Sequence, residues 1–461
     1  MTKRLRGGAL VGIGMLGSAL VAASGARPDA PTTDTGTYAF VNTSVVPMDA
    51  ERVLENHTVL VVDERITRVG PADEVEVPDG ATRIDGEGRY LMPGLAEMHA
   101  HIPGADASPP YLENTLFLYL ANGITTIRGM LGEPAHLDLR ERAARGDLLS
   151  PRIYTSGPSL NGNSVSSAEQ AREMVREQAA AGYDFLKLHP GLTRAEFDAI
   201  DEEADEADID FAGHVSLDVG LERTLEARQA TIDHLDGYVE AMAGPGAPAS
   251  QFFGLNLVDR VDLEVLPELA GETARAGVWN VPTQALFPDF LGDPAELRRR
   301  ADVRYVPPGM VDGWADAVRQ QQAGPLLSPE NGLRFLEVRR EILKALHDAG
   351  AGILLGSDAP QVFNVPGFSM HEELEEYVRA GLTPYEALRT GTVNVAVFYG
   401  AEAERGTVAE GRVADLVLLR GNPLEDVANV RDPAGVMVRG RWLSGPAIEE
   451  RLNAIADGYG R

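Results

Sequence analysis

The stretch Glu97-Met98-His99-Ala100-His101 places two histidines, two positions apart, at the end of an apolar run. In a β-strand the side chains of residues i and i+2 point to the same face, so His99 and His101 would lie side by side. Two neutral imidazoles at one strand end can bind a divalent cation, although such a pair also arises often without any ligand role. The meaning of the pair therefore depends on the segments that follow it.

Residues 94–402 alternate between short apolar segments and longer segments with helical periodicity, such as 167–181 and 330–349. Eight such alternations predict an α/β fold of the (β/α)8, TIM-like barrel type rather than an open doubly wound sheet. No glycine-rich nucleotide-binding motif follows any of the strand candidates. The strand candidates end at residues 99–101, 124–128, 153–156, 185–189, 210–214, 232–234, 279–283 and 353–358.

Segments rich in β-forming residues flank the predicted barrel at 36–93 and 403–446. Turn signals such as Pro78-Asp79-Gly80 and Gly421-Asn422-Pro423 separate their short strands. We predict that the two segments form one small, discontinuous β-sandwich domain, which a C-terminal tail at 447–461 follows.

The first 26 residues have the pattern of an export signal, because Lys3, Arg4 and Arg6 precede an apolar run at 9–23. That run is shorter than the roughly 20 residues that a membrane-spanning helix needs, which favours a cleaved signal (1–26) over an uncleaved anchor. We therefore expect an exported, periplasmic or extracellular protein with a linker at 27–35 and no membrane contact in its mature form.

The composition excludes several classes of function. The chain has no cysteine, so any metal must be bound by histidine, carboxylate or modified lysine. Its formal net charge of −29 disfavours binding to nucleic acid. Lysine occurs only at Lys3, Lys187 and Lys344, and arginine supplies the other basic side chains. This scarcity makes the position of Lys187 informative.

Lys187 lies in the apolar segment 185–189, between Leu186 and Leu188. If the two leucines pack outward on helices, the alternation of a strand turns Lys187 into the barrel. A buried lysine is costly unless it is discharged, paired or modified. Its primary amine, unlike the guanidinium of arginine, can lose a proton and react. We interpret Lys187 as a candidate for chemistry, with an ordinary ion-paired lysine as the alternative.

Three more candidate ligands end later strand candidates, namely His214, His234 and Asp358. Each of them alone is commonplace. Together with the histidine pair and Lys187, they fall at the C-terminal ends of strands one, four, five, six and eight, which converge on one mouth in a barrel. The sequence therefore predicts a cluster of metal-binding side chains at that mouth.

The chain at this point resembles the amidohydrolase superfamily, specifically the branch that contains imidazolonepropionase-like proteins and prolidase-type dipeptidases. The resemblance covers nearly the whole chain after the export signal, and it is much less specific for a substrate than for the superfamily. Besides the histidine pair, its motifs are Pro93-Gly94-Leu95, 123–128 (GITTIR), 381–388 (GLTPYEAL), 411–417 (GRVADLV) and 421–424 (GNPL).

This resemblance implies a binuclear metal centre. The histidine pair and Asp358 would bind one divalent ion, and His214 and His234 would bind the second. Lys187, carboxylated by carbon dioxide, would bridge the two ions. Zinc is the default for imidazole and carboxylate ligands, and manganese or cobalt would also fit. Two such ions make a nucleophile of water at neutral pH, and Asp358 would act as general base and then as general acid.

Four further residues are weaker candidates. Tyr238 is a candidate to bind the substrate carbonyl or oxyanion, with simple packing as the alternative. His189 is a candidate substrate contact behind the ligands, and Arg128 is expected to be structural. The long segment 286–333 is a predicted lid, in which Arg304 is a candidate to bind a substrate carboxylate.

The predicted function is hydrolysis of an amide C–N bond in a small-molecule substrate, either a dipeptide in the manner of prolidase or an N-acyl amino acid. The alternative is opening of a cyclic amide or lactone, as in imidazolonepropionase, but that pattern has one metal and lacks the bridging lysine. Deamination is disfavoured because Leu217 stands where the family's deaminases carry a glutamate. A non-catalytic binding protein is disfavoured because every ligand is present. A homo-oligomer is compatible with the sequence.

Overall fold

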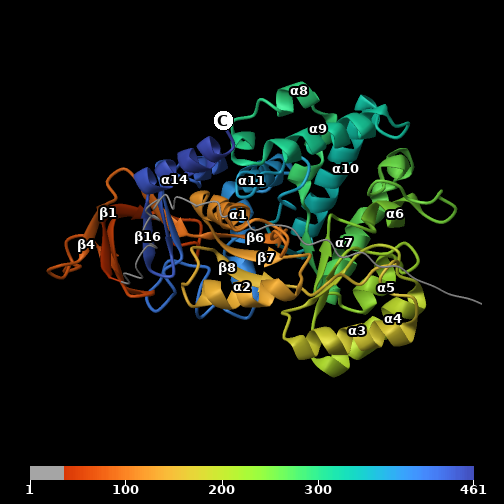
Figure 1. Ribbon diagram of the computed structural model, residues 1–461, viewed down its shortest axis with the longest axis horizontal. Helices are drawn as coiled ribbons and strands as arrows, with labels where there is room; N and C mark the ends of the chain where they lie inside the picture. Colours follow the sequence, from red (N-terminus) through yellow and green to blue (C-terminus); the bar gives the residue numbers. More distant parts are fainter. Residues whose placement is uncertain (1–35, 461) are drawn as a thin grey trace, which may run out of the picture. The chain divides into compact units, whose positions relative to one another are not determined.

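Strands from both ends of the chain pair with each other in the computed structural model, which describes residues 36–460. The predicted signal and linker, 1–26 and 27–35, lie outside the described residues. The strands concerned are β1 (Thr37–Val45), β2 (Leu54–Val62), β3 (Arg65–Pro71), β4 (Thr82–Asp85), β5 (Tyr90–Pro93), β14 (Leu416–Leu419), β15 (Pro433–Val438) and β16 (Arg441–Ser444). They form one sheet of order β16-β15-β14-β5-β1-β2-β3, in which β4 pairs with β1 (Figure 1).

The strands of the two segments belong to one hydrogen-bonded order, because β5 pairs with β1 on one side and, antiparallel, with β14 on the other. Arg65 of β3 also bridges Val413, just before β14. The β-sandwich stays a prediction, with which this curved arrangement is compatible. The buried side chains of Phe40, Val59 and Ile66 pack in one apolar cluster with Leu416 and Met437, which holds the two segments together.

The segment predicted as a C-terminal tail is mostly helical, because α14 (Gly445–Gly458) occupies it. Ser444 caps this helix by accepting a hydrogen bond from the backbone N–H of Ala447. The helix packs on β15 and on α1 (Pro109–Ala121), which explains why its apolar residues Ile448 and Ile455 are buried.

Eight parallel strands lie between these two segments, at the eight positions where the sequence predicts them. β6 (Leu95–Ala100), β7 (Ile124–Gly129) and β8 (Arg152–Thr155) form one sheet. The other sheet contains β9 (Leu186–Leu188), β10 (Phe211–Gly213), β11 (Thr231–Asp233), β12 (Trp279–Val281) and β13 (Gly352–Ile353). Isolated parallel bridges, Ser156 with Phe185 and Ala100 with Ala359, link the two sheets. A closed (β/α)8 barrel stays a prediction, which these bridges support.

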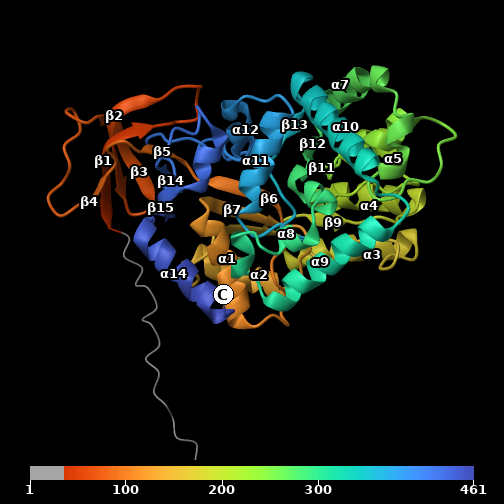
Figure 2. The ribbon, with the colours of Figure 1, turned by 90° about the horizontal axis from the view of Figure 1, so that it is seen from above.

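Helices follow most of these strands, and Figure 2 shows α3, α4 and α5 around β9 and β11. Local capping sets their starts: Thr193 and Glu196 form a capping box on α4, and Ser167 caps α3.

None of the helices within residues 36–460 is long and apolar enough to cross a membrane. The helices are α2 (Pro134–Ala144), α3 (Ala168–Ala181), α4 (Arg194–Ala207), α5 (Gly220–Glu226), α6 (Tyr238–Ala243), α7 (Leu266–Ala276), α8 (Pro294–Leu297), α9 (Pro308–Ala323), α10 (Pro329–Asp348), α11 (Ser369–Arg379), α12 (Pro384–Thr390) and α13 (Val393–Phe398).

Candidate metal centre

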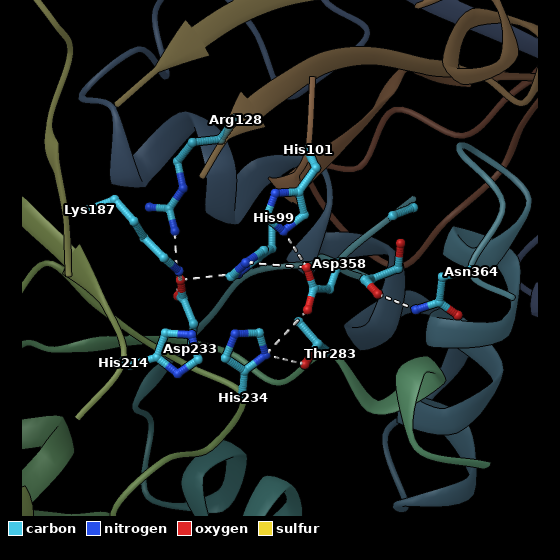
Figure 3. Close-up of polar contacts among 12 residues, drawn as sticks. His99, His101, Arg128, Lys187, His214, Asp233, His234, Thr283, Asp358 and Asn364 are labelled. Atoms are coloured by element: carbon cyan, nitrogen blue, oxygen red, sulfur yellow. Dashed lines mark hydrogen bonds and ion pairs between the residues drawn. The ribbon is translucent and has the colours of Figure 1, made fainter. Parts of the chain in front are cut away.

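Three candidate ligands meet where β6 ends and the chain leaves β13. The Nε2 atom of His101 lies 2.6 Å from Oδ1 of Asp358, and Nε2 of His99 lies 3.5 Å from the same oxygen. Donor atoms of these three side chains lie within 4.8 Å of one another (Figure 3). Two imidazoles and a carboxylate at this spacing suit a divalent cation of the zinc type. We call His99, His101 and Asp358 the first ligand group.

Glu97 holds the first ligand group in place from within the fold. Its Oε1 accepts hydrogen bonds from the backbone N–H groups of His99, at 3.0 Å, and Ser357, at 2.8 Å. Its Oε2 accepts a hydrogen bond of 2.6 Å from the Ser357 hydroxyl. Burial raises the pKa of Glu97 to about 8. The side chain ties the end of β6 to the residue before Asp358 and so sets the spacing of the ligands.

The second ligand group, which consists of Lys187, His214 and His234, lies beside the first. The ring centroid of His234 is 4.5 Å from that of His214 and 4.6 Å from that of His99. Lys187 is fully buried, and its Nζ donates to Oδ2 of Asp233 at 3.5 Å. Figure 3 shows these side chains facing the same space as the first group. Carboxylation of Lys187 and its bridging position stay predictions.

Gly213 explains how the aliphatic chain of Lys187 fits between two strands. It has φ of 128°, and a Cβ atom there would lie 2.3 Å from the Leu188 carbonyl oxygen and 3.0 Å from Cδ of Lys187. Only glycine allows this approach of β10 to β9. The glycine therefore makes room for the lysine and also precedes His214.

Burial keeps three imidazoles of this site neutral, those of His99, His189 and His234. It holds the pKa values of His99 and His234, which are 1% and 2% exposed, well below the ordinary histidine range. It also lowers the pKa of His189 to about 2. A neutral imidazole keeps one nitrogen lone pair free for a cation. The charge state of the site thus favours metal binding.

Asp233 is a charged residue of the site that the sequence interpretation missed. Its carboxylate lies 3.0 Å from Nδ1 of His99 and 3.5 Å from a guanidinium nitrogen of Arg128, in addition to its contact with Lys187. Burial alone would raise the pKa of Asp233, but Lys187 and Arg128 outweigh it and lower that pKa. The sequence offered one signal for Asp233. It is an aspartate within a strand candidate, in a barrel that was predicted to bury Lys187.

Two more residues orient the second ligand group through hydrogen bonds. Nδ1 of His214 lies 2.8 Å from Oδ2 of Asp236, and Nδ1 of His234 lies 2.8 Å from the hydroxyl oxygen of Thr283. Each bond leaves Nε2 as the nitrogen free for a cation, an arrangement common to metal-binding histidines. Sequence analysis gave no signal for Thr283, because it comes from a strand end with no ligand of its own.

The backbone of the site is strained at three residues that are not glycine. His234, Thr283 and Asp358 have φ of 61°, 49° and 67°, in the left-handed region. Such conformations cost of order 1 kcal/mol or more each and persist where the surrounding structure imposes them, often at functional sites. Their concentration among two ligands and one ligand partner fits a functional centre.

Comparison with known proteins agrees with this geometry. The amidohydrolase family model matches residues 90–443. The chain belongs to the amidohydrolase family. Ochratoxinase from Aspergillus niger is 23% identical over 88% of this chain and 86% of its own. Bottromycin amidohydrolase superposes with a TM-score of 0.72 at 25% identity, covering 93% and 92% of the two chains. A Xaa-Pro dipeptidase with bound methionine has a TM-score of 0.63 at 17% identity, covering 89% and 100%, and is alike in fold.

A cavity of about 550 Å³ lies beside His214 in this amidohydrolase. It adjoins the metal centre, because the ring centroid of Phe253, which lines it, is 5.5 Å from that of His234. No lysine or arginine occurs among the described residues that line the cavity. Its wall combines apolar side chains with three carboxylates, and includes Leu192, Val215, Phe252, Phe253, Asp218, Asp236 and Glu240.

Tyr238 does not reach this space. Its fully buried hydroxyl lies 2.9 Å from the Thr273 hydroxyl and donates to Oδ1 of Asn280 at 3.1 Å. The side chain therefore packs between α7 and β12, and we no longer propose it as a substrate contact. The contacts of Tyr238 are those of the packing alternative that the sequence left open, and the chain turns through left-handed residues at His234, Leu235 and Gly237 before α6.

Arg304, in the segment predicted as a lid, has its contacts away from the two ligand groups. The Arg304 side chain is exposed, its guanidinium lies 4.8 Å from the Tyr305 ring centroid, and it donates to the Tyr305 hydroxyl. Segment 286–333 contains α8 and α9, and Arg300 within it forms an ion pair of 2.9 Å with Glu372 of α11. Arg304 therefore has no contact with the ligand groups in the described structure.

The other two weaker candidates lie at the site. The His189 ring stacks on that of His214 at a centroid distance of 5.0 Å. Arg128 is buried, donates to the Met98 carbonyl at 2.9 Å and to the Thr231 hydroxyl at 2.8 Å, and thereby links β6, β7 and β11. Arg128 thus has the contacts of a structural residue.

Proposed function

We propose that this amidohydrolase is a metal-dependent hydrolase that cleaves an amide C–N bond in a small molecule, most simply a dipeptide. The observation that carries the proposal is the approach of donor atoms from His99, His101 and Asp358 to within 4.8 Å. Two imidazoles and one carboxylate fit a divalent cation by ligand type. We further propose that the two parallel sheets belong to one (β/α)8 barrel, whose mouth holds the centre.

A divalent ion at this centre, zinc by default and manganese or cobalt as alternatives, would polarise the scissile carbonyl and lower the pKa of water. The residues of the chain perform the proton transfers. Asp358 would accept the proton of the attacking water and deliver it to the leaving amine nitrogen. His101, 2.6 Å away, orients that carboxylate. Lys187, once carboxylated, would supply the anion that bridges a second ion held by His214 and His234.

The cavity beside His214 favours a dipeptide over an N-acyl amino acid. Asp218, Asp236 and Glu240 give it negative charge, and its described lining residues include no basic side chain that would bind a carboxylate. A free α-ammonium group complements three carboxylates. Leu192, Phe252 and the other apolar walls suit a hydrophobic side chain. The substrate class we propose is therefore a dipeptide with a free amino group and an apolar N-terminal residue.

Paired substrates test this proposal. Zinc-loaded protein would be assayed with phenylalanyl and leucyl dipeptides and with the N-acetyl derivative of each. We expect chelation to abolish turnover and kcat/KM for the free dipeptides to exceed that for the acetylated ones by about tenfold, the equivalent of one lost charged contact of ~1.4 kcal/mol. Faster turnover of acetylated substrates overturns the substrate class. Turnover of cyclic amides or lactones alone supports the imidazolonepropionase-like alternative, and loaded protein without hydrolytic activity supports a binding protein.

The place of action stays an inference from sequence. We propose that the protein is exported, on the basis of the basic and apolar pattern of residues 1–26. Fractionation of cells that express the full chain, followed by determination of the mature N-terminus, tests this. A full-length chain in the cytoplasm overturns it.

A further inference from the structure

Arg339 is a buried cation outside the two ligand groups. It lies on α10 and is 1% exposed. In the described part of the chain no carboxylate oxygen lies within 4.0 Å of its guanidinium nitrogens, so it forms no ion pair. Burial of a charge without a paired charge is costly. The contacts that compensate this cost therefore indicate what the residue does.

All three nitrogens of Arg339 donate to the segments that follow β11 and β12, the first of which begins with the ligand candidate His234. Nη1 donates to the His234 carbonyl at 2.7 Å, and Nη2 donates to the Pro282 carbonyl at 2.6 Å. Nε donates to the side-chain carbonyl of Gln284 at 2.7 Å. The guanidinium also lies 3.8 Å from the ring centroid of Phe287. A rigid guanidinium fork can hold three acceptors at fixed spacing, which an ammonium group cannot.

These bonds fix the two peptide planes that carry the strained backbone. The His234 carbonyl belongs to the peptide that leads into Leu235, whose φ is 56°, and the Pro282 carbonyl to the peptide that leads into Thr283, whose φ is 49°. A fixed carbonyl direction restricts the dihedral angles on both sides of the peptide bond. Arg339 therefore acts on the backbone of His234 and of the threonine that shares a hydrogen bond with its imidazole.

Glu373 completes the same arrangement from α11. Its Oε2 accepts a hydrogen bond of 2.6 Å from the backbone N–H of Ala285, which follows Gln284. The segment after β12 is thus held from two helices. Arg339 on α10 donates to the Pro282 carbonyl and the Gln284 side chain, and Glu373 on α11 accepts from the Ala285 N–H. The two helices fix the segment without contributing a ligand.

We infer that Arg339 is a positioning residue for the second ligand group, holding His234 and Thr283 in the left-handed backbone that directs the His234 imidazole to the metal centre. This inference rests on the binuclear centre of the proposed function, but it concerns residues that bind neither metal nor substrate. It requires that loss of Arg339 weakens the second metal and spares the first.

Zinc titration against a competing chelator tests the inference without measuring activity. The proteins would be wild type, Arg339→Lys, Arg339→Ala and the control Arg340→Ala, which removes a neighbouring ion pair of α10 with Glu376. We expect wild type and Arg340→Ala to bind roughly two ions alike. Both Arg339 variants should bind the first ion normally and the second about 10- to 100-fold more weakly, as when hydrogen-bond partners of metal-bound histidines are lost.

Chemical rescue separates positioning from general damage to the fold. Millimolar guanidinium, too dilute to denature, should restore part of the second affinity to Arg339→Ala, because it refills the vacated space. Thermal unfolding of the metal-free proteins reports whether each variant folds. If Arg339→Ala does not fold, the zinc affinities of Arg339→Lys decide the test.

The outcomes distinguish failure of the inference from failure of the proposed function. Two ions bound with wild-type affinity by Arg339→Lys overturn the role of Arg339 alone. Equal weakening in the Arg340→Ala control also overturns it, because the effect would then belong to α10 as a whole. A wild-type chain that binds a single ion overturns the binuclear centre and, with it, the role of Arg339.

Discussion

The two ligand groups differ in how their donor atoms are held. In the first, the ligands touch one another, with 2.6 Å between His101 and Asp358. Asp233 also lies 3.0 Å from Nδ1 of His99. In the second group no such direct contact is present among the described side chains, and each of the three is oriented by an outside partner, namely Asp233, Asp236 or Thr283. A group in which every side chain depends on an outside partner is sensitive to the loss of any one of those partners. We therefore expect metal binding by the second group to respond more strongly to changes outside the group.

The largest expected effect is that of Asp358→Asn, which removes the proton acceptor and keeps the side-chain shape. We expect kcat to fall at least ~10²-fold, the scale of a lost general acid–base. The comparison for the second group is Asp236→Asn, a change in an outside partner, which weakens the orientation of His214 and should cost about tenfold. Steady-state kinetics at saturating zinc measure both. Equal losses would contradict the difference between the groups, and an Asp358→Asn enzyme near wild-type rate would remove Asp358 as the base.

Lys187→Ala should separate the groups by metal content. The variant should lose the second ion, keep the first and turn over about 10- to 100-fold more slowly, because it lacks the proposed bridging anion. Formate or acetate should restore part of the rate. The control is Lys344→Ala, since Lys344 is exposed and bonds to Asp348 on α10. Elemental analysis counts the ions. A bare Lys187 amine in a crystal that holds both ions would contradict carboxylation.

Thr283→Val tests a single hydrogen bond of the second group. The change keeps the side-chain volume but removes the partner of His234 Nδ1, so the second ion should bind about tenfold more weakly. Thr390→Val is the matched control, because the Thr390 hydroxyl is equally buried and donates to the Ala387 carbonyl, away from the ligands. Zinc titration of both variants gives the comparison. If Thr283→Val and Thr390→Val change the zinc affinity equally, the hydrogen bond to His234 makes no specific contribution to metal binding.

The sequence was sufficient to predict the eight parallel strands and the proximity of His99, His101 and Asp358, and the metal-binding role of the six candidate ligands stays a prediction. The strands are apolar runs of fixed alternation, and residues at their C-terminal ends must converge when parallel strands lie side by side. The position of Lys187 between Leu186 and Leu188 predicted its burial, and the structure places it fully buried. Local pattern therefore predicts an element and the direction in which its side chains point.

The partners of the ligands could not be predicted, because they depend on loops with left-handed backbone and on contacts distant in sequence. Thr283 and Arg339 reach His234 across 49 and 105 positions, and no periodicity relates them. The pairing of β5 with β14 has a similar cause, since the contact of Leu416 with Pro93 joins segments distant in sequence. The side-chain pattern of a strand does not determine with which distant strand it pairs.

The smallest expected effect is that of Tyr238→Phe, which distinguishes the structure from the sequence-based assignment of Tyr238 as a catalytic residue. The hydroxyl bonds to Thr273 and Asn280 and contacts neither ligand group. Loss of the hydroxyl should lower the free energy of unfolding by about 1 kcal/mol, and by up to ~3 kcal/mol if the buried Asn280 Oδ1 finds no other donor. It should change kcat/KM by less than about threefold. Chemical denaturation and kinetics on one preparation measure both quantities. A loss of ~10²-fold or more in kcat with unchanged stability would mean that Tyr238 turns to the substrate during turnover and that α6 moves relative to the second ligand group.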